Sequence, residues 1–401
     1  MTPPPMPTDQ RRLLLLLAAM QFTHLLDYMV LMPLGAEVMR VFSVDAASFG
    51  WLVGVYTLAS ASAALFGAAA LDRYDRRHVL LVLYAGFIVA TLACAAAPSF
   101  NALLLARAIA GACAGLMTAT VMALIGDRIE PARRGQAVGT VMSAFGASAV
   151  AGVPLGLWLA SMAGWRAPFV FVAALALVCW LLLARLLPST RTAPGTRVGI
   201  GAIFAQPGLA LGWLLTFGIV FSGFLIVPYI GAFLGGTLGI AVSDLSWFYL
   251  CAGAATFVSA RFIGQAADRF GPVRVLALLM IASIAPHLAF THLTPSPLPL
   301  VAAIFVAFMV LTSSRAIPAL AFLINRVPPP LRGRYMSINM ACSDAASGLA
   351  AATSGLIVGS QPEAFGNFGV IGWVATGVTL STLALLWKLQ QPRRVEAAAV
   401  S

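Results

Sequence analysis

Four ionisable residues stand inside long apolar stretches of this sequence, where a charge is costly to bury. Asp27 lies in the first stretch beside Tyr28, and Asp344 lies in a late one. Arg107 and Arg315 belong to two further stretches. A charged side chain at the centre of a membrane costs at least ~2.5–3.5 kcal/mol, so such residues usually face a partner or a water-filled space and serve ion or proton pathways. These four side chains are therefore the first candidates for chemistry.

Asp27 is the candidate proton carrier. It stands about 14 residues into its stretch, which is roughly 21 Å along a helix, and His24 precedes it by one turn. Arg107 and Glu37 are the residues expected to act together with Asp27 in proton coupling. Two alternatives stay open: Asp27 as a hydrogen-bonded structural acid, and Arg107, about five residues inside its stretch, as a side chain that extends to the membrane interface.

Arg315 and Asp344 form a second candidate pair, for substrate binding or gating. Arg315 precedes Arg326 by 11 residues, or about 16 Å along a helix, so it is expected at a depth similar to that of Asp344. This depth predicts a salt bridge between them. Such a pair is either a structural clamp or a switch that substrate or a proton opens.

The composition requires a membrane around these residues. Of the 401 residues, 61% are hydrophobic and 9% are charged, whereas a soluble domain carries about a quarter charged residues. Runs of about 20 apolar residues, enough to cross a bilayer core of roughly 30 Å, recur throughout. We expect an all-α polytopic membrane protein with uncleaved transmembrane helices at 13–38, 47–70, 78–97, 102–125, 137–161, 167–187, 208–235, 245–267, 275–293, 298–323, 336–358 and 368–389.

Arginines mark alternate loops between these stretches. One set of loops holds Arg73, Arg76, Arg77, Arg128, Arg133, Arg134, Arg191, Arg197, Arg269, Arg274, Arg326, Arg332 and Arg334, and the opposite set holds Arg40 and Arg166. Short cytoplasmic loops accumulate Lys and Arg, so both termini are expected in the cytoplasm, with the protein in the inner (plasma) membrane of a bacterial host. The net charge of +11 follows from this arrangement and indicates no nucleic-acid partner.

The two halves of the sequence repeat each other. Asp72-Arg73 follows the second predicted helix as Asp268-Arg269 follows the eighth, about 196 residues later. Pro131 to Gly135 likewise matches Pro329 to Gly333 at about 198 residues. A polar linker at 191–206 therefore separates a six-helix bundle over 1–190 from another over 207–401. Parallel repeats of this kind occur in transporters, with a substrate site between them near the midplane.

At these loops the sequence resembles the major facilitator superfamily, over essentially its whole length. The segment from Gly264 through Asp268 and Arg269 to Gly271 fits the signature GxxxDRxG residue for residue. The first-half copy keeps Asp72, Arg73, Arg76 and Arg77 but has Ala68 and Asp75 in place of the two glycines. The resemblance implies a conformational latch, in which a carboxylate and arginines bridge helix ends. The alternative is that these charges only set topology.

Two further segments extend the resemblance. Arg107 to Gly111 resembles the RxxxG motif of the family's fourth helix. Gly152, Pro154 and Gly156 resemble the antiporter motif of the drug:proton exchange branch, which includes permeases for arabinose or sugar efflux, although Val153 separates the glycine from the proline. That motif implies close packing and a bend in the fifth helix; the alternative is packing alone.

The resemblance also implies a central cavity lined by helices 1, 4, 7 and 10. Aromatic and methionine side chains in those helices adapt to varied apolar ligands. The candidates are Tyr28, Met32, Met117, Phe217, Phe221, Tyr229 and Phe308. Each can equally serve packing.

These features together favour a transporter. We expect a proton-coupled secondary transporter that exports a small drug-like or sugar-like compound by alternating access; the alternatives are an uptake symporter and a membrane sensor of the same fold. Its partners are substrate, protons and the lipid bilayer, and we expect a monomer with no cofactor beyond the proton gradient. The four histidines and five cysteines form no catalytic or metal-binding motif, so no enzyme is expected.

Overall fold

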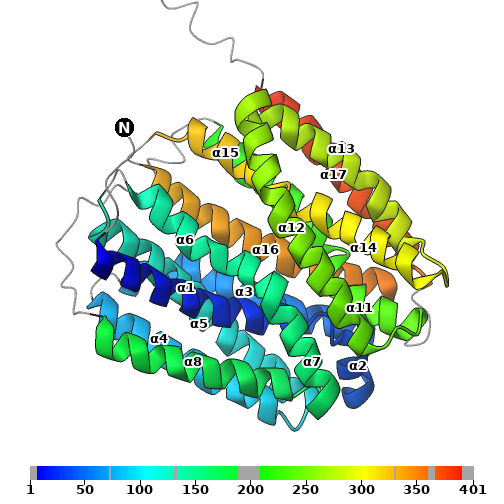
Figure 1. Cartoon of the computed structure of the whole chain (residues 1–401), viewed down its shortest axis with the longest axis horizontal. Helices are drawn as coiled ribbons and strands as arrows, with labels where there is room; N and C mark the ends of the chain where they lie inside the picture. Colours follow the sequence, from blue (N-terminus) through cyan, green and yellow to red (C-terminus); the bar gives the residue numbers. More distant parts are fainter. Residues whose placement is uncertain are drawn as a thin grey trace, which may run out of the picture.

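The computed structural model describes residues 7–71, 74–130, 133–187, 208–328, 331–359 and 366–390. Within these ranges all regular elements are helices, and 12 helical spans are long and apolar enough to cross a membrane (Figure 1). The all-α fold with twelve spans is confirmed. The predicted linker at 191–206, together with Asp72 and Arg73, lies outside the described residues.

The N-terminal half contains six spans. They are α1 (Thr8–Val30), α3 (Ala46–Leu71), α4 (Arg76–Ala96), α5 (Phe100–Arg128), α6 (Arg134–Ala147) joined to α7 (Val153–Ala163) by the π-helix Ser148–Gly152, and α8 (Ala167–Leu186). The prediction of one helix over 13–38 is wrong at its end, because α1 stops at Val30 and a separate α2 (Gly35–Phe42) follows. Pro33 stands in the turn between them and has no backbone N–H to continue the helix.

The C-terminal half contains the other six spans. They are α10 (Leu209–Phe224) with Val227–Tyr229, α11 (Ile230–Ala232) and Phe233–Thr237 as short continuations, α12 (Val242–Phe270), α13 (Pro272–Thr291), α14 (Leu298–Ser313) with α15 (Ala316–Arg326), α16 (Arg332–Val358) and α17 (Phe368–Gln390). The tenth span breaks between α14 and α15 because Pro318 cannot donate to the carbonyl of Ser314. That carbonyl accepts instead from the backbone N–H of Ile317, at 3.3 Å.

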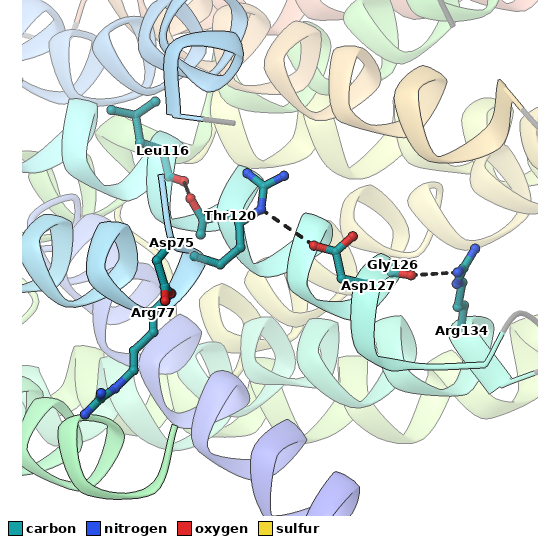
Figure 2. Close-up of polar contacts among 8 residues, drawn as sticks. Asp75, Arg77, Leu116, Thr120, Gly126, Asp127 and Arg134 are labelled. Atoms are coloured by element: carbon teal, nitrogen blue, oxygen red, sulfur yellow. Dashed lines mark hydrogen bonds and ion pairs between the residues drawn. The ribbon is translucent and has the colours of Figure 1, made fainter. Parts of the chain in front are cut away.

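The same arginine closes the same loop in each half. Arg134 Nε donates to the carbonyl of Ile129 at 3.0 Å, and Arg332 Nε donates to the carbonyl of Val327 at 3.1 Å. Arg134 also reaches the carbonyl of Gly126 at 2.6 Å, as Figure 2 shows. The two arginines occupy matching places in the sequence repeat, so the repeat extends to individual hydrogen bonds.

The two halves meet closely at the end of the bundle that carries α2 and α11, named the α2 end (Figure 1). There Tyr229 Oη donates to the carbonyl of Ala46 at 2.8 Å and to that of Ala351 at 3.2 Å. Gly231 lies directly against the backbone of Pro33, with no room for a side chain. The opposite end, where α1 begins and where Arg134 and the other loop arginines lie, is named the basic end.

Between the two ends, α3 and α16 form the seam between the halves. A Cβ on Gly54 would lie 2.6 Å from the carbonyl oxygen of Gly348, and a Cβ on Gly348 would lie 2.6 Å from Thr57 Oγ1. Helices approach this closely only where small residues face each other. The glycines therefore set the distance across the seam.

Candidate functional site

Asp27 and Arg107 form a buried ion pair between α1 and α5. Arg107 NH1 lies 2.6 Å from Asp27 Oδ2, and both side chains are 0% exposed. The same nitrogen donates to the carbonyl of Asp27 at 3.1 Å. Arg107 is thus held inside the bundle and does not extend to the membrane interface. Glu37, on the short α2, makes no ion pair with either residue among those described.

Tyr56 of α3 completes this site. The guanidinium carbon of Arg107 lies 4.3 Å from the centre of the Tyr56 ring, a cation–π contact, and Tyr56 Oη donates to the carbonyl of His24 at 3.1 Å. Gly111, one turn after Arg107 on the same face of α5, makes this possible, because a side chain there would collide with the backbone of Tyr56. The sequence analysis missed Tyr56, since the RxxxG spacing signals a close neighbour without saying which helix supplies it.

Three atoms of the pair keep unused hydrogen-bonding capacity. Among the described residues, Asp27 Oδ1, Arg107 Nε and Arg107 NH2 are buried and have no hydrogen-bond partner. A carboxyl group can bind a proton, whereas a guanidinium remains charged at any accessible pH. The arrangement therefore allows Asp27 to take up a proton at Oδ1 while Oδ2 still faces Arg107.

A line of polar side chains runs from this pair toward the basic end. His24 and Gln21 lie one and two turns before Asp27 on α1, both buried, with His24 Nε2 2.7 Å from Gln21 Oε1. Thr118 Oγ1 of α5 lies 3.4 Å from each of them and is partly exposed. These three side chains form a hydrogen-bonded cluster between Asp27 and the basic end, but none of the described hydrogen bonds joins the cluster to Asp27.

The structure does not form the expected salt bridge between Arg315 and Asp344. Asp344 Oδ2 accepts from Ser60 Oγ at 2.6 Å, across the seam between α16 and α3. Arg315 turns into its own half, where its NH1 donates to Ser222 Oγ at 3.2 Å. Counting residues along a helix gives depth but not the direction in which a side chain faces, and here the two residues face different neighbours.

The aromatic candidates divide into two groups. Tyr28 stacks on Tyr56 and Phe224 at 5.3 and 6.4 Å between ring centres, which joins the two halves. Phe217 and Phe221 stack at 5.5 Å and are partly exposed. Of these three candidates, Phe217 and Phe221 keep exposed surface for a ligand, whereas Tyr28 is buried, at 7% exposed.

The other four candidates are fully or almost fully buried. Tyr229 serves the contact at the α2 end described above. Phe308 packs on His287 and Phe290 inside the C-terminal half, with ring centres 5.4 and 5.5 Å away. Met32 and Met117 are 4% and 0% exposed. Nothing places these four against a ligand.

The arginines of the first latch segment bind helix ends within the N-terminal half. Arg76 Nε lies 3.6 Å from Asp127 Oδ2, the ion pair that ends on Asp127 in Figure 2. Arg77 NH2 donates to the carbonyl of Ala184 at 2.5 Å, and its backbone N–H donates to Asp75 Oδ1 at 2.7 Å. The carboxylate partner is thus Asp127 at the end of α5, which the sequence analysis did not identify.

The second latch segment is more open. Asp268 and Arg269 are exposed, and the Arg269 guanidinium carbon lies 5.2 Å from the centre of the Phe270 ring. Gly271 has φ +89°, a conformation that favours glycine and lets α13 begin directly after α12. Gly264 has open space where a side chain would stand, so its packing does not require glycine.

The glycines of the predicted antiporter-like helix pack on α1 beside Asp27. A Cβ on Gly152 would lie 2.9 Å from Leu26 Cδ1, and one on Gly156 would collide with Val30. A π-helix, Ser148–Gly152, ends just before Pro154. The fifth span therefore approaches α1 closely around the proton-carrier candidate.

A sequence model of the Major Facilitator Superfamily matches residues 17–223 and matches again over residues 212–400. The chain belongs to the major facilitator superfamily. Each match covers one six-span half, in agreement with the repeated loops. Members of this family are transporters and not enzymes, so the protein is a multi-pass membrane transporter.

Relatives and solved structures in this superfamily agree with the fold. An uncharacterized MFS-type transporter of Bacillus subtilis (strain 168), YceJ, is 26% identical over 377 residues, which are 92% of this chain and 96% of the relative. Puromycin resistance protein pur8 of Streptomyces alboniger is 34% identical over 209 residues, 49% of this chain and 41% of that protein. The crystal structure of a bacterial homologue of the human lysosomal transporter Spinster, inward-facing and unoccupied, superposes with TM-score 0.73 at 19% identity, covering 96% of this chain and 95% of that one.

Proposed function

We propose that the protein exports a small organic compound, drug-like or sugar-like, in exchange for protons. The observation that carries this proposal is the ion pair of Asp27 and Arg107, which is fully buried in the bundle. Asp27 Oδ1 does not face Arg107 and can bind an incoming proton without displacing it.

Proton binding changes the strength of this pair. While Asp27 is ionised, it forms an ion pair with Arg107; once Asp27 is protonated, the attraction between opposite charges is lost, and the guanidinium keeps the carbonyl of Asp27 and the ring of Tyr56 as neighbours. The buried charge of the site then changes from zero to +1. This change weakens the connection between α1 and α5 and so alters the N-terminal half in response to the proton.

The direction of proton release follows from the contacts between the halves. Tyr229 and Gly231 close the α2 end, while His24, Gln21 and Thr118 lie between Asp27 and the basic end. Loop arginines favour a cytoplasmic basic end. An exporter closed at its α2 end would release its proton to the cytoplasm and accept its substrate from there.

The nature of the substrate is supported by two observations. The partly exposed stack of Phe217 and Phe221 offers apolar surface to a small organic molecule. The relative from Streptomyces alboniger is named for puromycin resistance, which favours export over uptake.

Everted membrane vesicles test this function. Respiration acidifies their lumen, and a pH-sensitive dye then reports proton movement when puromycin, arabinose or 1-naphthoate is added as a cationic, neutral or anionic probe. Exchange predicts alkalinisation of the lumen by at least one probe, loss of that signal in Asp27→Asn, and retention in Asp9→Asn, an exposed acid at the start of the same helix.

Three results would contradict the proposal. Acidification of the lumen on addition of a probe indicates proton symport. A full signal in Asp27→Asn, at wild-type expression, removes Asp27 as the proton carrier. No proton movement with any probe favours a sensor that retains the transporter fold.

A further inference from the structure

Arg315 is a second fully buried arginine, and no acidic side chain among the described residues pairs with it. It is 0% exposed and lies at the break between α14 and α15. Its Nε donates to the carbonyl of Thr312 at 3.2 Å and its NH1 donates to Ser222 Oγ at 3.2 Å. NH2 has no hydrogen-bond partner among the described residues. Both of its acceptors are neutral.

The comparison with Arg107 shows what is missing. Both guanidinium groups are 0% exposed, but Arg107 lies 2.6 Å from a carboxylate. Among the described residues, Arg315 forms no ion pair. An uncompensated charge buried in this way costs several kcal/mol. An anion from outside the protein, bound next to Arg315, would compensate this charge.

The surroundings of Arg315 have further unused polar atoms. His287 Nε2 lies 3.1 Å from Thr312 Oγ1, while His287 Nδ1 is buried and unpartnered. Ser314 Oγ, next to Arg315 in the chain, is also buried and unpartnered. Buried polar groups normally have partners. Three unsatisfied side chains around one helix break therefore indicate a site that a ligand completes.

Gly223 of α10 lies directly against the free nitrogen. A Cβ at this position would lie 3.2 Å from Arg315 NH2 and 2.7 Å from Thr312 Cγ2. The glycine therefore lets α10 pack closely on the end of the guanidinium fork. A methyl group at this position would press on Thr312 and on the end of that fork.

We infer that Arg315, with Ser222 and His287, binds an anion, and that the anionic group is the carboxylate of the transported compound. The planar guanidinium fork matches the two oxygens of a carboxylate. This inference rests on the proposed function for the source of the carboxylate. Because Arg315 is 0% exposed, binding requires the helices around the break between α14 and α15 to open. A free inorganic anion shares the same chemistry and is the other source.

Binding to the purified protein tests this site without requiring transport. The Tm of the detergent-solubilised protein is measured at increasing concentrations of acetate, benzoate and 1-naphthoate at constant ionic strength. The neutral amide of each acid, and chloride, are titrated in the same way as controls. Carboxylates are expected to raise Tm and amides are not. In Arg315→Gln the apparent Kd for the carboxylates is expected to rise at least about tenfold, or ~1.4 kcal/mol.

Matched variants separate binding from folding. Arg261→Gln removes an exposed arginine of α12 and leaves the Kd unchanged. Arg315→Lys keeps the charge but loses the fork, so its Kd lies between those of the wild type and Arg315→Gln. Gly223→Ala presses on the end of the guanidinium fork and weakens binding while Arg315 remains in place, which keeps the inference testable if Arg315→Gln does not fold.

The outcomes are distinct. A response to organic carboxylates but not to chloride supports a substrate site, and an equal response to chloride supports a site for inorganic anions. Equal shifts with acids and amides, or wild-type Kd values in both Arg315→Gln and Gly223→Ala, overturn the inference. Carboxylate binding without any proton movement in vesicles would instead contradict the proposed function and leave the anion site standing.

Discussion

The ion pair at the centre of the N-terminal half makes a quantitative prediction about stability. The perturbation is a double-mutant cycle of Asp27→Asn, Arg107→Gln and the variant with both changes. Each single change leaves the other charge buried without its partner. The double change replaces both charges by amides of similar size that can hydrogen-bond to each other.

The expected magnitudes follow from the geometry. The charged groups are in contact at 2.6 Å and fully buried; at an effective dielectric constant near 20 and about 4 Å between charge centres, their attraction is ~4 kcal/mol. Breaking such a pair by removing one partner costs about 3–5 kcal/mol. The loss of stability in Asp27→Asn is expected at the lower end of this range, because Arg107 keeps Tyr56 and the backbone carbonyl of residue 27 as neighbours. The double variant is expected to lose less than either single variant.

The free energy of unfolding is measured by denaturant titration of the protein in micelles. Because the double variant loses less than either single variant, the coupling energy between the two positions is expected to exceed the larger single loss, which makes it at least about 4 kcal/mol. For Arg107→Gln the loss in free energy of unfolding is expected to be smaller at acid pH, because the unpaired Asp27 can then bind a proton and become neutral. A coupling energy below about 1 kcal/mol, with losses that simply add, would refute the account of this pair.

Two further predictions concern packing and capping. Gly111→Ala forces a methyl group into the backbone of α3 and is expected to lower the free energy of unfolding by more than about 1–3 kcal/mol. Gly126→Ala on the same helix places its methyl group in open space and is expected to leave Tm unchanged or slightly raised. Equal melting curves for the two variants would contradict this packing. Asp45 accepts hydrogen bonds from the hydroxyl of Ser48 and, at 2.8 Å, from the backbone N–H of Ser48, and these bonds lower the pKa of Asp45. Asp45→Ala is therefore expected to cost about 1 kcal/mol at pH 7. The lowered pKa stabilises the fold at pH values above the unfolded pKa of about 3.9. The difference in free energy of unfolding between wild type and Asp45→Ala is therefore expected to shrink as the pH falls through the pKa of Asp45 in the folded protein. A constant difference down to pH 3 would be inconsistent with this cap.

The sequence predicted the spans well because length and hydropathy alone decide which segments cross a bilayer. It failed at the end of the first helix, where Pro33 interrupts an apolar run that hydropathy treats as continuous. It also predicted the loop motif around Arg134, but the bond of that side chain to the carbonyl of Ile129 required the folded loop.

The site was predictable only in part, for a geometric reason. The cost of burying charge identified Asp27 and Arg107, and counting residues placed Arg315 and Asp344 at similar depth. The rotation of each helix about its axis determines which side chains meet, and it depends on packing across the whole bundle. The missed contacts of Asp344 with Ser60 and of Arg107 with Tyr56 both depend on that rotation.

Transport driven by an imposed pH gradient tests the exchange mechanism most directly. The purified protein is reconstituted into liposomes with an acidic interior, and accumulation of the three vesicle probes is followed in the wild type and in Asp27→Asn. We predict accumulation of at least one probe by the wild type, abolished when nigericin collapses the gradient. In Asp27→Asn the same probe should only equilibrate across the membrane. Gradient-driven accumulation at the wild-type level in Asp27→Asn would contradict proton exchange through this residue.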